Sequence, residues 1–187
     1  AGDPHRTKQQ IVRIDREPPD MPRALALRLE RAVAAAPRMD AWILSDYGYG
    51  AVTEGILARL RKAGGLIVGS SRYALERMKG LSALTANEAE SQAASGLLDP
   101  KAAGSRLMEI LKPRRALLLT RGNEGMICFT NGKALSLPAV GSQEAVDVTG
   151  AGDTVIAVFT LALAAGAEPV DAAHLANAAA GQVVMRP

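Results

Sequence analysis

Short apolar runs alternate with stretches of helical character along most of this chain, and that alternation narrows the folds it can adopt. The runs "AWILSD" (41–46), "GLIVG" (65–69), "SALT" (82–85) and "RALLLT" (115–120) have the length and composition of buried strands. A further strand is predicted over 10–15, in "QIVRID". Because helical segments separate the strands, we predict an α/β fold of three layers, α/β/α, around a mostly parallel sheet.

Helix start and stop signals lie between these runs. We expect a helix over 21–36, with Asp20 as its N-cap and Pro22 in its first turn. A second helix is expected over 53–62, because "AGG" at 63–65 supplies the residues that a helix C-terminus favours.

After the run at 115–120 the pattern changes. The pair Asn131-Gly132 in "TNGK" is a strong hairpin signal between two short apolar segments, so an antiparallel excursion is predicted within the α/β pattern. Two segments rich in Ala, Val and Leu, 151–165 and 170–185, are predicted to be buried helices. No linker-like segment divides the chain, and we therefore expect one domain.

The composition excludes several classes of protein. With 187 residues, 48% of them hydrophobic, the chain can bury a core. Its 22 Lys and Arg face 19 Asp and Glu, and the net charge of +3 is spread along the sequence, which argues against a nucleic-acid partner. No apolar stretch reaches the roughly 20 residues that cross a bilayer, and the N-terminus has no signal segment. The single cysteine, Cys128, cannot form an internal disulfide, and we predict a cytoplasmic location without membrane association.

The segment "DVTGAGDT" (147–154) combines glycines and acids where a helix should begin. Gly150 and Gly152 let a ligand approach the backbone, and a helix starting near Ala151 offers unpaired N–H groups to an anion. Asp153 would repel a phosphate held by the same turn, a conflict that is resolved if Asp153 is the base that accepts the proton of an attacking hydroxyl. The alternative is a capping acid beside a plain turn, and short glycine motifs do recur by chance.

Two more motifs follow predicted strands, at the edge of the sheet where ligands sit in open α/β folds. "TRGNEG" (120–125) adds glycines after an apolar strand, although it also fits a simple turn into the hairpin. "TANEAE" (85–90) puts Asn87 and Glu90 on one face of a beginning helix, where they also fit a capping box.

In their order along the chain, with "TANEAE" first and "DVTGAGDT" last, these motifs resemble those of the PfkB, or ribokinase-like, carbohydrate kinases. "DVTGAGDT" is similar to the C-terminal signature of that family, "TANEAE" to its Asn-x-x-Glu motif and "LLLTRGNEG" to its Thr-x-Gly-x-x-Gly strand and loop. The segments 8–17, 43–52 and 176–181 resemble the branch of heptose-7-phosphate kinases found in ADP-heptose synthesis proteins. The resemblance covers essentially the whole chain and implies a ribokinase-like fold.

The resemblance also implies roles for the matching residues. Asp153 would be the catalytic base, and the backbone of Gly150, Ala151 and Gly152 would form an anion hole. Asn87 and Glu90 would place the magnesium-bound phosphates, Glu90 through water. The remaining implied ligands are Thr120, Gly122 and Gly125 along the nucleotide phosphates and ribose, Asn177 near the adenine, Asp46 facing the cleft, and Lys8, Gln10 and Arg13 near the sugar. The alternation of those last three also fits the solvated face of a strand.

The implied cofactors are ATP and Mg²⁺, with a monovalent cation as a further candidate. The implied reaction is phosphorylation of a sugar or sugar phosphate, with D-glycero-D-manno-heptose 7-phosphate at O1 as the preferred acceptor. The alternatives are another ribokinase-like sugar kinase and a nucleotide-binding module without catalysis. A dinucleotide-dependent oxidoreductase is disfavoured, because no Gly-x-Gly-x-x-Gly follows an early strand. A homodimer is a further expectation, through a lid sheet that could include 10–15.

The chain departs from the pattern of this branch in three ways. Ser70 stands where an acidic residue usually precedes "SRY", and a hydroxyl cannot replace a carboxylate in organising hydrated magnesium. Ala86 replaces the usual proline before Asn87, which affects loop stiffness more than chemistry. Members of the family are also longer, with an N-terminal portion that supplies much of the sugar pocket. We therefore expect residues 1–187 to be one partial kinase domain, holding the nucleotide-binding half and the base.

Overall fold

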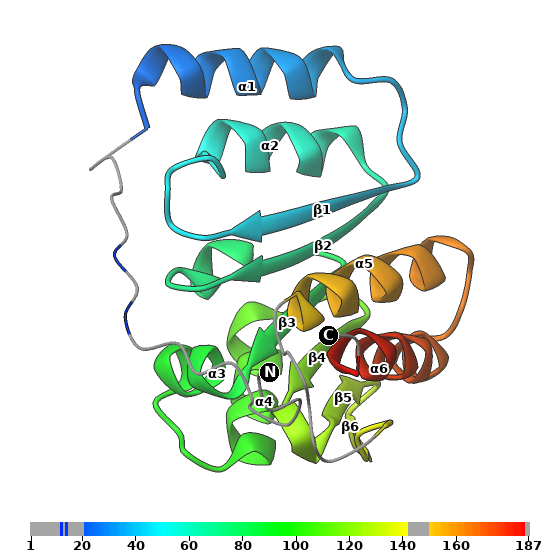
Figure 1. The fold of residues 1–187 in the computed structure, drawn as a ribbon. Coiled ribbons are helices and arrows are strands. Elements are labelled where there is room, and N and C mark those ends of the chain that lie inside the picture. The colour runs from blue at the N-terminus through cyan, green and yellow to red at the C-terminus, as the bar shows by residue number, and fades with distance from the viewer. Residues whose placement is uncertain (1–11, 13, 15–20, 142–149, 186–187) are drawn as a thin grey trace, which may run out of the picture.

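A computed structural model describes residues 12, 14, 21–141 and 150–185. Within them, a six-stranded sheet with the order β1-β2-β3-β4-β5-β6 forms the centre of the molecule (Figure 1). The strands are β1 (Ala41–Asp46), β2 (Leu66–Ser71), β3 (Ala83–Asn87), β4 (Ala116–Thr120), β5 (Met126–Thr130) and β6 (Lys133–Leu137). The α-helices are α1 (Arg23–Ala35), α2 (Glu54–Ala63), α3 (Glu88–Ser95), α4 (Pro100–Leu111), α5 (Ala151–Ala164) and α6 (Pro169–Val184). Two short 3₁₀ helices, η1 (Leu75–Met78) and η2 (Gly122–Glu124), complete the described elements.

Strands β1 to β4 run parallel and in sequence order, which decides where their connections lie. Because parallel crossovers are right-handed, stepping always in one direction across the sheet puts every crossover on the same face. The first core cluster agrees with this: it joins side chains of α2 and α4, such as Leu57 and Leu107, to one side of the strands.

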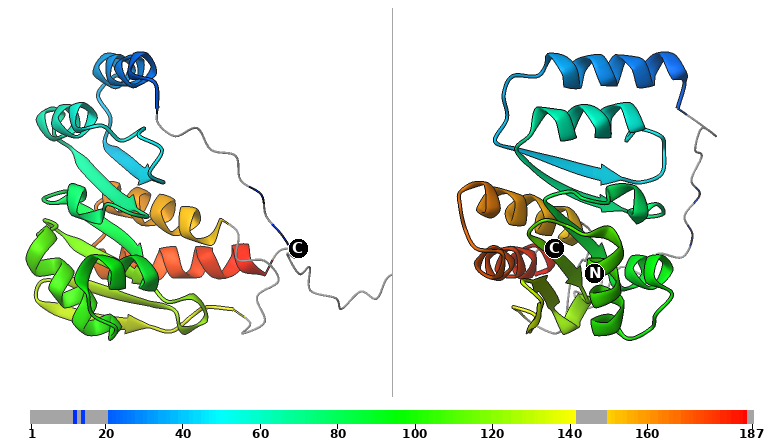
Figure 2. Two further views of the ribbon diagram at one scale, coloured as in Figure 1. Left: turned by 90° about the vertical axis from the view of Figure 1, so that its left-hand side faces the viewer. Right: turned by 180° about the vertical axis from the view of Figure 1, so that it is seen from behind.

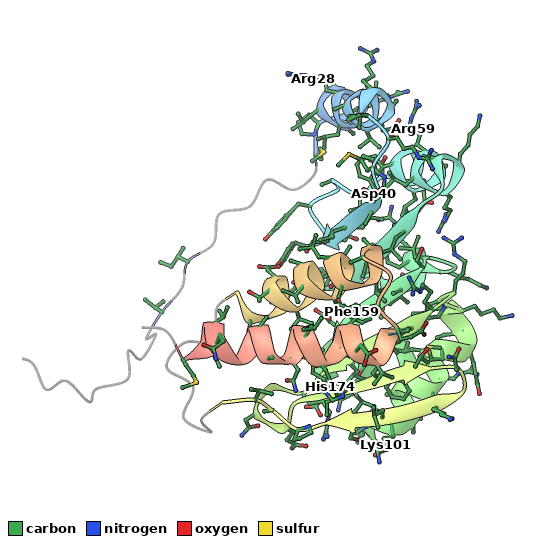
Figure 3. The ribbon with its side chains drawn as sticks, turned by 90° about the vertical axis from the view of Figure 1, so that its right-hand side faces the viewer. Arg28, Asp40, Arg59, Lys101, Phe159 and His174 are labelled. Atoms are coloured by element: carbon green, nitrogen blue, oxygen red, sulfur yellow. The ribbon has the colours of Figure 1, made fainter. Side chains whose placement is uncertain are left out.

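The opposite face is covered by α5 and α6, so the inner strands β2 to β5 are mostly buried and the predicted α/β/α layering is confirmed. Strand β4 illustrates it, since Leu117 and Leu119 belong to the first cluster and Leu118 to the second. Phe159 of α5 is fully buried in the second cluster. Figure 3 shows it where α5 and α6 meet, in contrast to the exposed Arg28 on α1.

The first helix lies outside α2, far from α6 (Figures 1 and 2). It begins at Arg23 with Pro22 as N-cap, so the predicted start at residue 21 is wrong. The reason is steric, because a proline disfavours helical geometry in the residue before it. The predicted cap, Asp20, lies outside the described residues, as does most of the strand predicted over 10–15.

The predicted antiparallel excursion is confirmed. Strand β5 pairs antiparallel with both β4 and β6. Asn131 and Gly132 form the turn between β5 and β6 with φ angles of 49° and 71°, the left-handed geometry that a tight hairpin requires. Among the described residues, no helix combines the length and the apolar character needed to cross a bilayer.

Candidate active site

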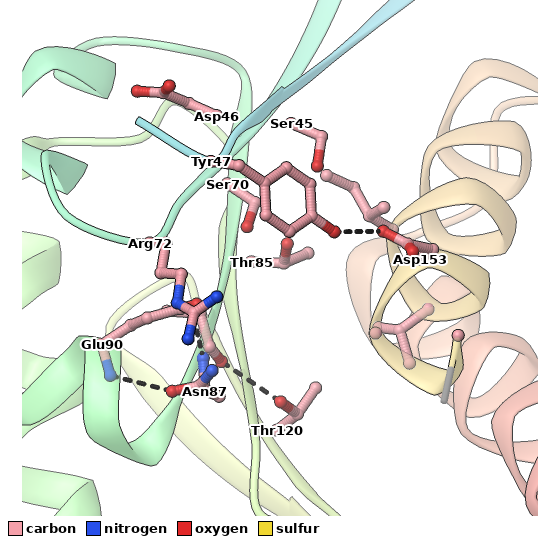
Figure 4. A pocket seen from close by; sticks show the side chains of 15 residues that line it. Ser45, Asp46, Tyr47, Ser70, Arg72, Thr85, Asn87, Glu90, Thr120 and Asp153 are labelled. Atoms are coloured by element: carbon pink, nitrogen blue, oxygen red, sulfur yellow. Dashed lines mark hydrogen bonds between the residues drawn. The ribbon is translucent and has the colours of Figure 1, made fainter. Parts of the chain in front are cut away.

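The carboxyl ends of the four parallel strands meet the first turn of α5 around a cavity of about 340 Å³. In open α/β sheets this edge is where ligands bind. The cavity is lined by Ser45, Asp46, Tyr47, Ser70, Arg72, Thr85, Ala86, Asn87, Glu90, Thr120, Gly150, Gly152, Asp153, Val155 and Ile156 (Figure 4). The structure thus brings together residues of three motifs that are far apart in the sequence.

Asp153 lies in the first turn of α5, which begins after Gly150. Gly150 adopts a left-handed conformation, φ 80°, and its carbonyl accepts hydrogen bonds from the backbone N–H and the side-chain hydroxyl of Thr154, each at 2.9 Å. The first N–H groups of a helix have no partner within it, so this turn presents donors to an anion. The Asp153 side chain is exposed, and its Oδ1 accepts a 3.0 Å hydrogen bond from the hydroxyl of Tyr47.

Asn87 and Glu90 form the capping box that the sequence left open as an alternative. The Asn87 side chain accepts from the Glu90 backbone N–H at 2.8 Å, and Glu90 Oε2 accepts from the Asn87 backbone N–H at 2.9 Å. Burial raises the pKa of Glu90 above its ordinary value, an effect that the hydrogen bonds with Asn87 and the charge of Arg72 partly offset. Both side chains line the cavity, so capping and ligand contact are compatible here.

The loops after β3 and β4 are tied together by one guanidinium group. Arg121 Nε donates to Glu88 Oε1 at 2.8 Å, and Arg121 also pairs with Glu124 in the following turn. The hydrogen bond that Arg121 donates to Glu88 is the main cause that raises the pKa of the guanidinium. The pair holds the start of α3 against the loop that follows Thr120.

A second cavity, of about 490 Å³, adjoins the first and shares Thr120, Gly152 and Val155 with it. Its lining is mostly small and apolar: Thr120, Gly122, Asn123, Gly125, Met126, Ala139, Val140, Ala151, Gly152, Val155, Asn177, Ala180, Gly181 and Val184. Four residues predicted to contact the nucleotide, Thr120, Gly122, Gly125 and Asn177, therefore lie together. The Asn177 side chain is buried and donates to the Pro138 carbonyl at 2.7 Å.

Two glycines of the second cavity are required by packing. A Cβ on Gly125 would lie 2.1 Å from the Leu137 carbonyl oxygen, and one on Gly181 would lie 2.1 Å from the Val140 carbonyl oxygen. Gly152 and Gly150 differ, since a Cβ on either would meet no described residue within 4 Å.

Asp46 lines the first cavity, but both of its carboxylate oxygens are engaged within the chain. Oδ1 accepts from the Gly48 N–H at 3.0 Å, and Oδ2 accepts from the Ser71 hydroxyl at 3.1 Å. Arg77 lies 3.8 Å from Oδ2. Figure 4 shows the carboxylate pointing away from Asp153, so a contact between Asp46 and substrate stays a prediction.

Three predicted sugar ligands, Lys8, Gln10 and Arg13, lie outside the described residues. Several residues that line the first cavity were not predicted from the sequence, among them Tyr47 and Arg72. Each follows the end of a predicted parallel strand, and that position was the signal that could have identified them.

Among the described residues, no group of three or more His, Cys, Asp or Glu side chains could hold a metal ion alone. Magnesium commonly keeps several waters and takes one or two protein carboxylates together with substrate phosphates. The half-buried carboxylate of Glu90 beside the cavity is a donor of that kind. The residues present therefore fit a magnesium ion that arrives with a phosphate ligand.

The fold has counterparts among known structures. Escherichia coli phosphofructokinase-2 in complex with fructose-6-phosphate superposes with a TM-score of 0.78 at 18% identity, over 94% of this chain and 61% of that one. Arabidopsis thaliana ribokinase complexed with ribose and ATP gives a TM-score of 0.65 at 20% identity, over 91% of this chain and 55% of that one. At these identities the likeness concerns the fold, and the predicted ribokinase-like fold is confirmed.

Comparison of sequences identifies relatives of this chain and its family. The bifunctional protein HldE of Chromohalobacter salexigens is 41% identical over 187 residues, which cover 96% of this chain and 39% of that protein. HldE of Sodalis glossinidius is 40% identical over 188 residues, which cover 94% of this chain and 38% of that protein. The chain thus spans under two fifths of the length of these relatives. The profile of the pfkB family carbohydrate kinases matches residues 59–187, which hold the whole lining of the second cavity and most of that of the first, and the chain belongs to that family.

Proposed function

We propose that this chain is the nucleotide-binding half, with the catalytic base, of an ATP-dependent sugar kinase. The observation that carries the proposal is the pair of adjoining cavities that share Thr120, Gly152 and Val155. An apolar cavity beside a polar one suits a nucleotide whose base lies in the apolar cavity and whose phosphates reach the polar one. Asp153 stands in the polar cavity, where the transferred phosphoryl group would meet the acceptor hydroxyl.

In the proposed reaction the acceptor hydroxyl loses its proton to Asp153 as its oxygen attacks the γ-phosphorus of ATP, and the bond from that phosphorus to the β–γ bridging oxygen breaks, so that ADP leaves. The N–H groups of the first turn of α5, over Gly150 to Gly152, stabilise the charge that develops on the transferring group. Glu90 and Asn87 face the same space and help to place the phosphates. Bound Mg²⁺ would neutralise phosphate charge, with Glu90 acting on it through water.

The proposed acceptor is D-glycero-D-manno-heptose 7-phosphate, phosphorylated at O1. It is supported by the identity of about two fifths to the HldE proteins, which is spread over nearly the whole chain. A monovalent cation is a further candidate cofactor, because a related fold, Escherichia coli phosphofructokinase-2, is known in complex with potassium.

The second candidate is a nucleotide-binding module without catalysis. It is favoured by Ser70, which lines the cavity at the position where this branch usually has an acid. The chain would then bind ATP in the apolar cavity and leave the phosphoryl group in place.

Two measurements on the complete gene product separate these functions. Calorimetry with ATP and Mg²⁺ measures nucleotide binding, and a coupled assay measures ADP release with heptose 7-phosphate, fructose 6-phosphate and ribose in turn. We expect binding together with ADP release that depends on the heptose phosphate. Binding without turnover on any sugar would support the module, and a preference for another sugar would correct the acceptor.

A further inference from the structure

The turn after β1 brings Tyr47 into contact with Asp153, although the two residues are 106 positions apart in the sequence. The phenolic hydroxyl donates to Asp153 Oδ1 at 3.0 Å, and Figure 4 shows the ring extending from the end of β1 toward α5. Tyr47 lies before the segment that the family profile matches, 59–187. The contact needs an explanation of its own.

The backbone that carries Tyr47 is held firmly on the sheet. The preceding residue, Asp46, is buried and accepts hydrogen bonds from Gly48 and from Ser71 of the neighbouring strand. Gly48 adopts φ 84°, and a Cβ there would lie 2.8 Å from Cδ2 of the Tyr73 ring, so this tight turn requires glycine. Tyr47 therefore reaches the cavity from a fixed starting point.

Asp153 has fewer constraints. Its side chain is exposed, and a carboxylate in the first turn of a helix can also rotate toward the N–H groups of that turn. A base must face the hydroxyl that it deprotonates, and a misplacement of about 1 Å can lower a rate by about a hundredfold. A donor bound to Oδ1 selects one orientation of the carboxylate and leaves Oδ2 open to the acceptor.

We propose that Tyr47 is a positioning residue, whose hydroxyl holds Oδ1 of Asp153 so that Oδ2 faces the acceptor hydroxyl. The inference rests on the proposed function, in which Asp153 is the base. The hydrogen bond to Asp153, followed by burial, raises the pKa of Tyr47 above its ordinary value of 10.0. The phenol therefore stays protonated and remains a donor throughout the neutral range. Tyr47 exchanges no proton with the substrate.

The first test measures the contact in solution. The complete gene product is labelled with carbon-13 tyrosine, and the Tyr47 resonance is identified by its loss in Tyr47→Phe. We expect this resonance to titrate above pH 10.0 in the wild-type protein, and at a lower pH in Asp153→Asn, where the charged acceptor is gone. A Tyr47 titration that Asp153→Asn leaves unchanged would overturn the contact.

The second test measures the consequence for turnover. Tyr47→Phe keeps the ring and removes only the hydroxyl, and we expect it to lower kcat by about tenfold while the KM for ATP stays unchanged. Tyr73→Phe is the matched control, because its ring is largely exposed beside Arg72 and lies outside both cavities. Thermal melting confirms that both variants fold.

The outcomes separate this inference from the function on which it rests. An active wild-type protein with equal kcat in Tyr47→Phe and Tyr73→Phe would overturn the positioning role alone. An inactive wild-type protein would overturn the proposed kinase function, and the positioning role with it.

Discussion

Two neighbouring residues at the end of β1, Asp46 and Tyr47, lie on different sides of the same turn. Asp46 is buried and bonded to Gly48 and Ser71, whereas Tyr47 is half-exposed and reaches Asp153. A carboxylate beside a cavity is an obvious candidate ligand from the sequence, yet here its oxygens hold the turn. The distinction depends on which way each side chain leaves the strand, since successive residues point to opposite faces.

Ser70 supplies a prediction at this scale. Ser70→Asp restores the acid that the resemblance expects, in a residue that already lines the cavity. A carboxylate there would help to organise hydrated magnesium, so we expect the Mg²⁺ concentration for half-maximal turnover to fall by roughly tenfold. The control is Ser45→Asp, which adds the same charge at the residue paired with Ser70 on β1. An equal effect of both substitutions would show that only net charge matters.

Among the elements, α3 begins with a capping box whose acid is half-buried. Because burial raises the pKa of Glu90, the folded state holds this proton more tightly than the unfolded state does. The stability gained from the protonated form is present at low pH and is lost as the carboxyl ionises with rising pH. An ionised Glu90 is therefore costly to the fold at neutral pH, a cost that agrees with its proposed role in placing the phosphates.

Glu90→Gln tests this cost. The amide oxygen can still accept from the Asn87 N–H, so we expect a slightly higher Tm than wild type at pH 7. The difference should shrink as the pH falls toward 4.5, the ordinary value for a glutamate. Phosphoryl transfer should fall in the same variant. The control is Glu109→Gln on α4, because Glu109 forms an exposed ion pair with Arg106. If the Tm gain of Glu90→Gln did not depend on pH, burial of the Glu90 carboxylate would not be its cause.

Gly152 in α5 and Gly181 in α6 differ in the room that a side chain would have, and we expect opposite effects when each is replaced by alanine. Gly152 lines both cavities, and a methyl group on it would meet no described residue within 4 Å, so we expect Gly152→Ala to gain up to about 1 kcal/mol in stability and to lose turnover. Gly181→Ala drives a methyl group against the Val140 carbonyl, so we expect stability to fall. Denaturant unfolding measures the stability of both variants, and the ADP-release assay measures their turnover. A destabilised Gly152→Ala would mean that the space beside α5 is not open.

Across the whole molecule, the alternation of strands and helices was predictable because short apolar runs such as 115–120 mark buried strands directly. The predicted strand over 82–85 ends two residues early, since Asn87 serves both as the last residue of β3 and as the N-cap of α3. The contact between Tyr47 and Asp153 could not be predicted, because only the assembled sheet brings them together. A homodimer through the segment 10–15 stays a prediction, since most of it lies outside the described residues.

The proposed role of Asp153 as the proton acceptor in phosphoryl transfer is tested most directly by comparing Asp153→Asn with Asp171→Asn. Asp153 and Asp171 are both acids in the first turn of a helix, but only Asp153 lines the cavity. In single-turnover experiments on the complete gene product, we expect Asp153→Asn to slow ADP formation by about a hundredfold or more while ATP affinity changes little. Asp171→Asn should match wild type. Near-normal transfer by Asp153→Asn would contradict the claim.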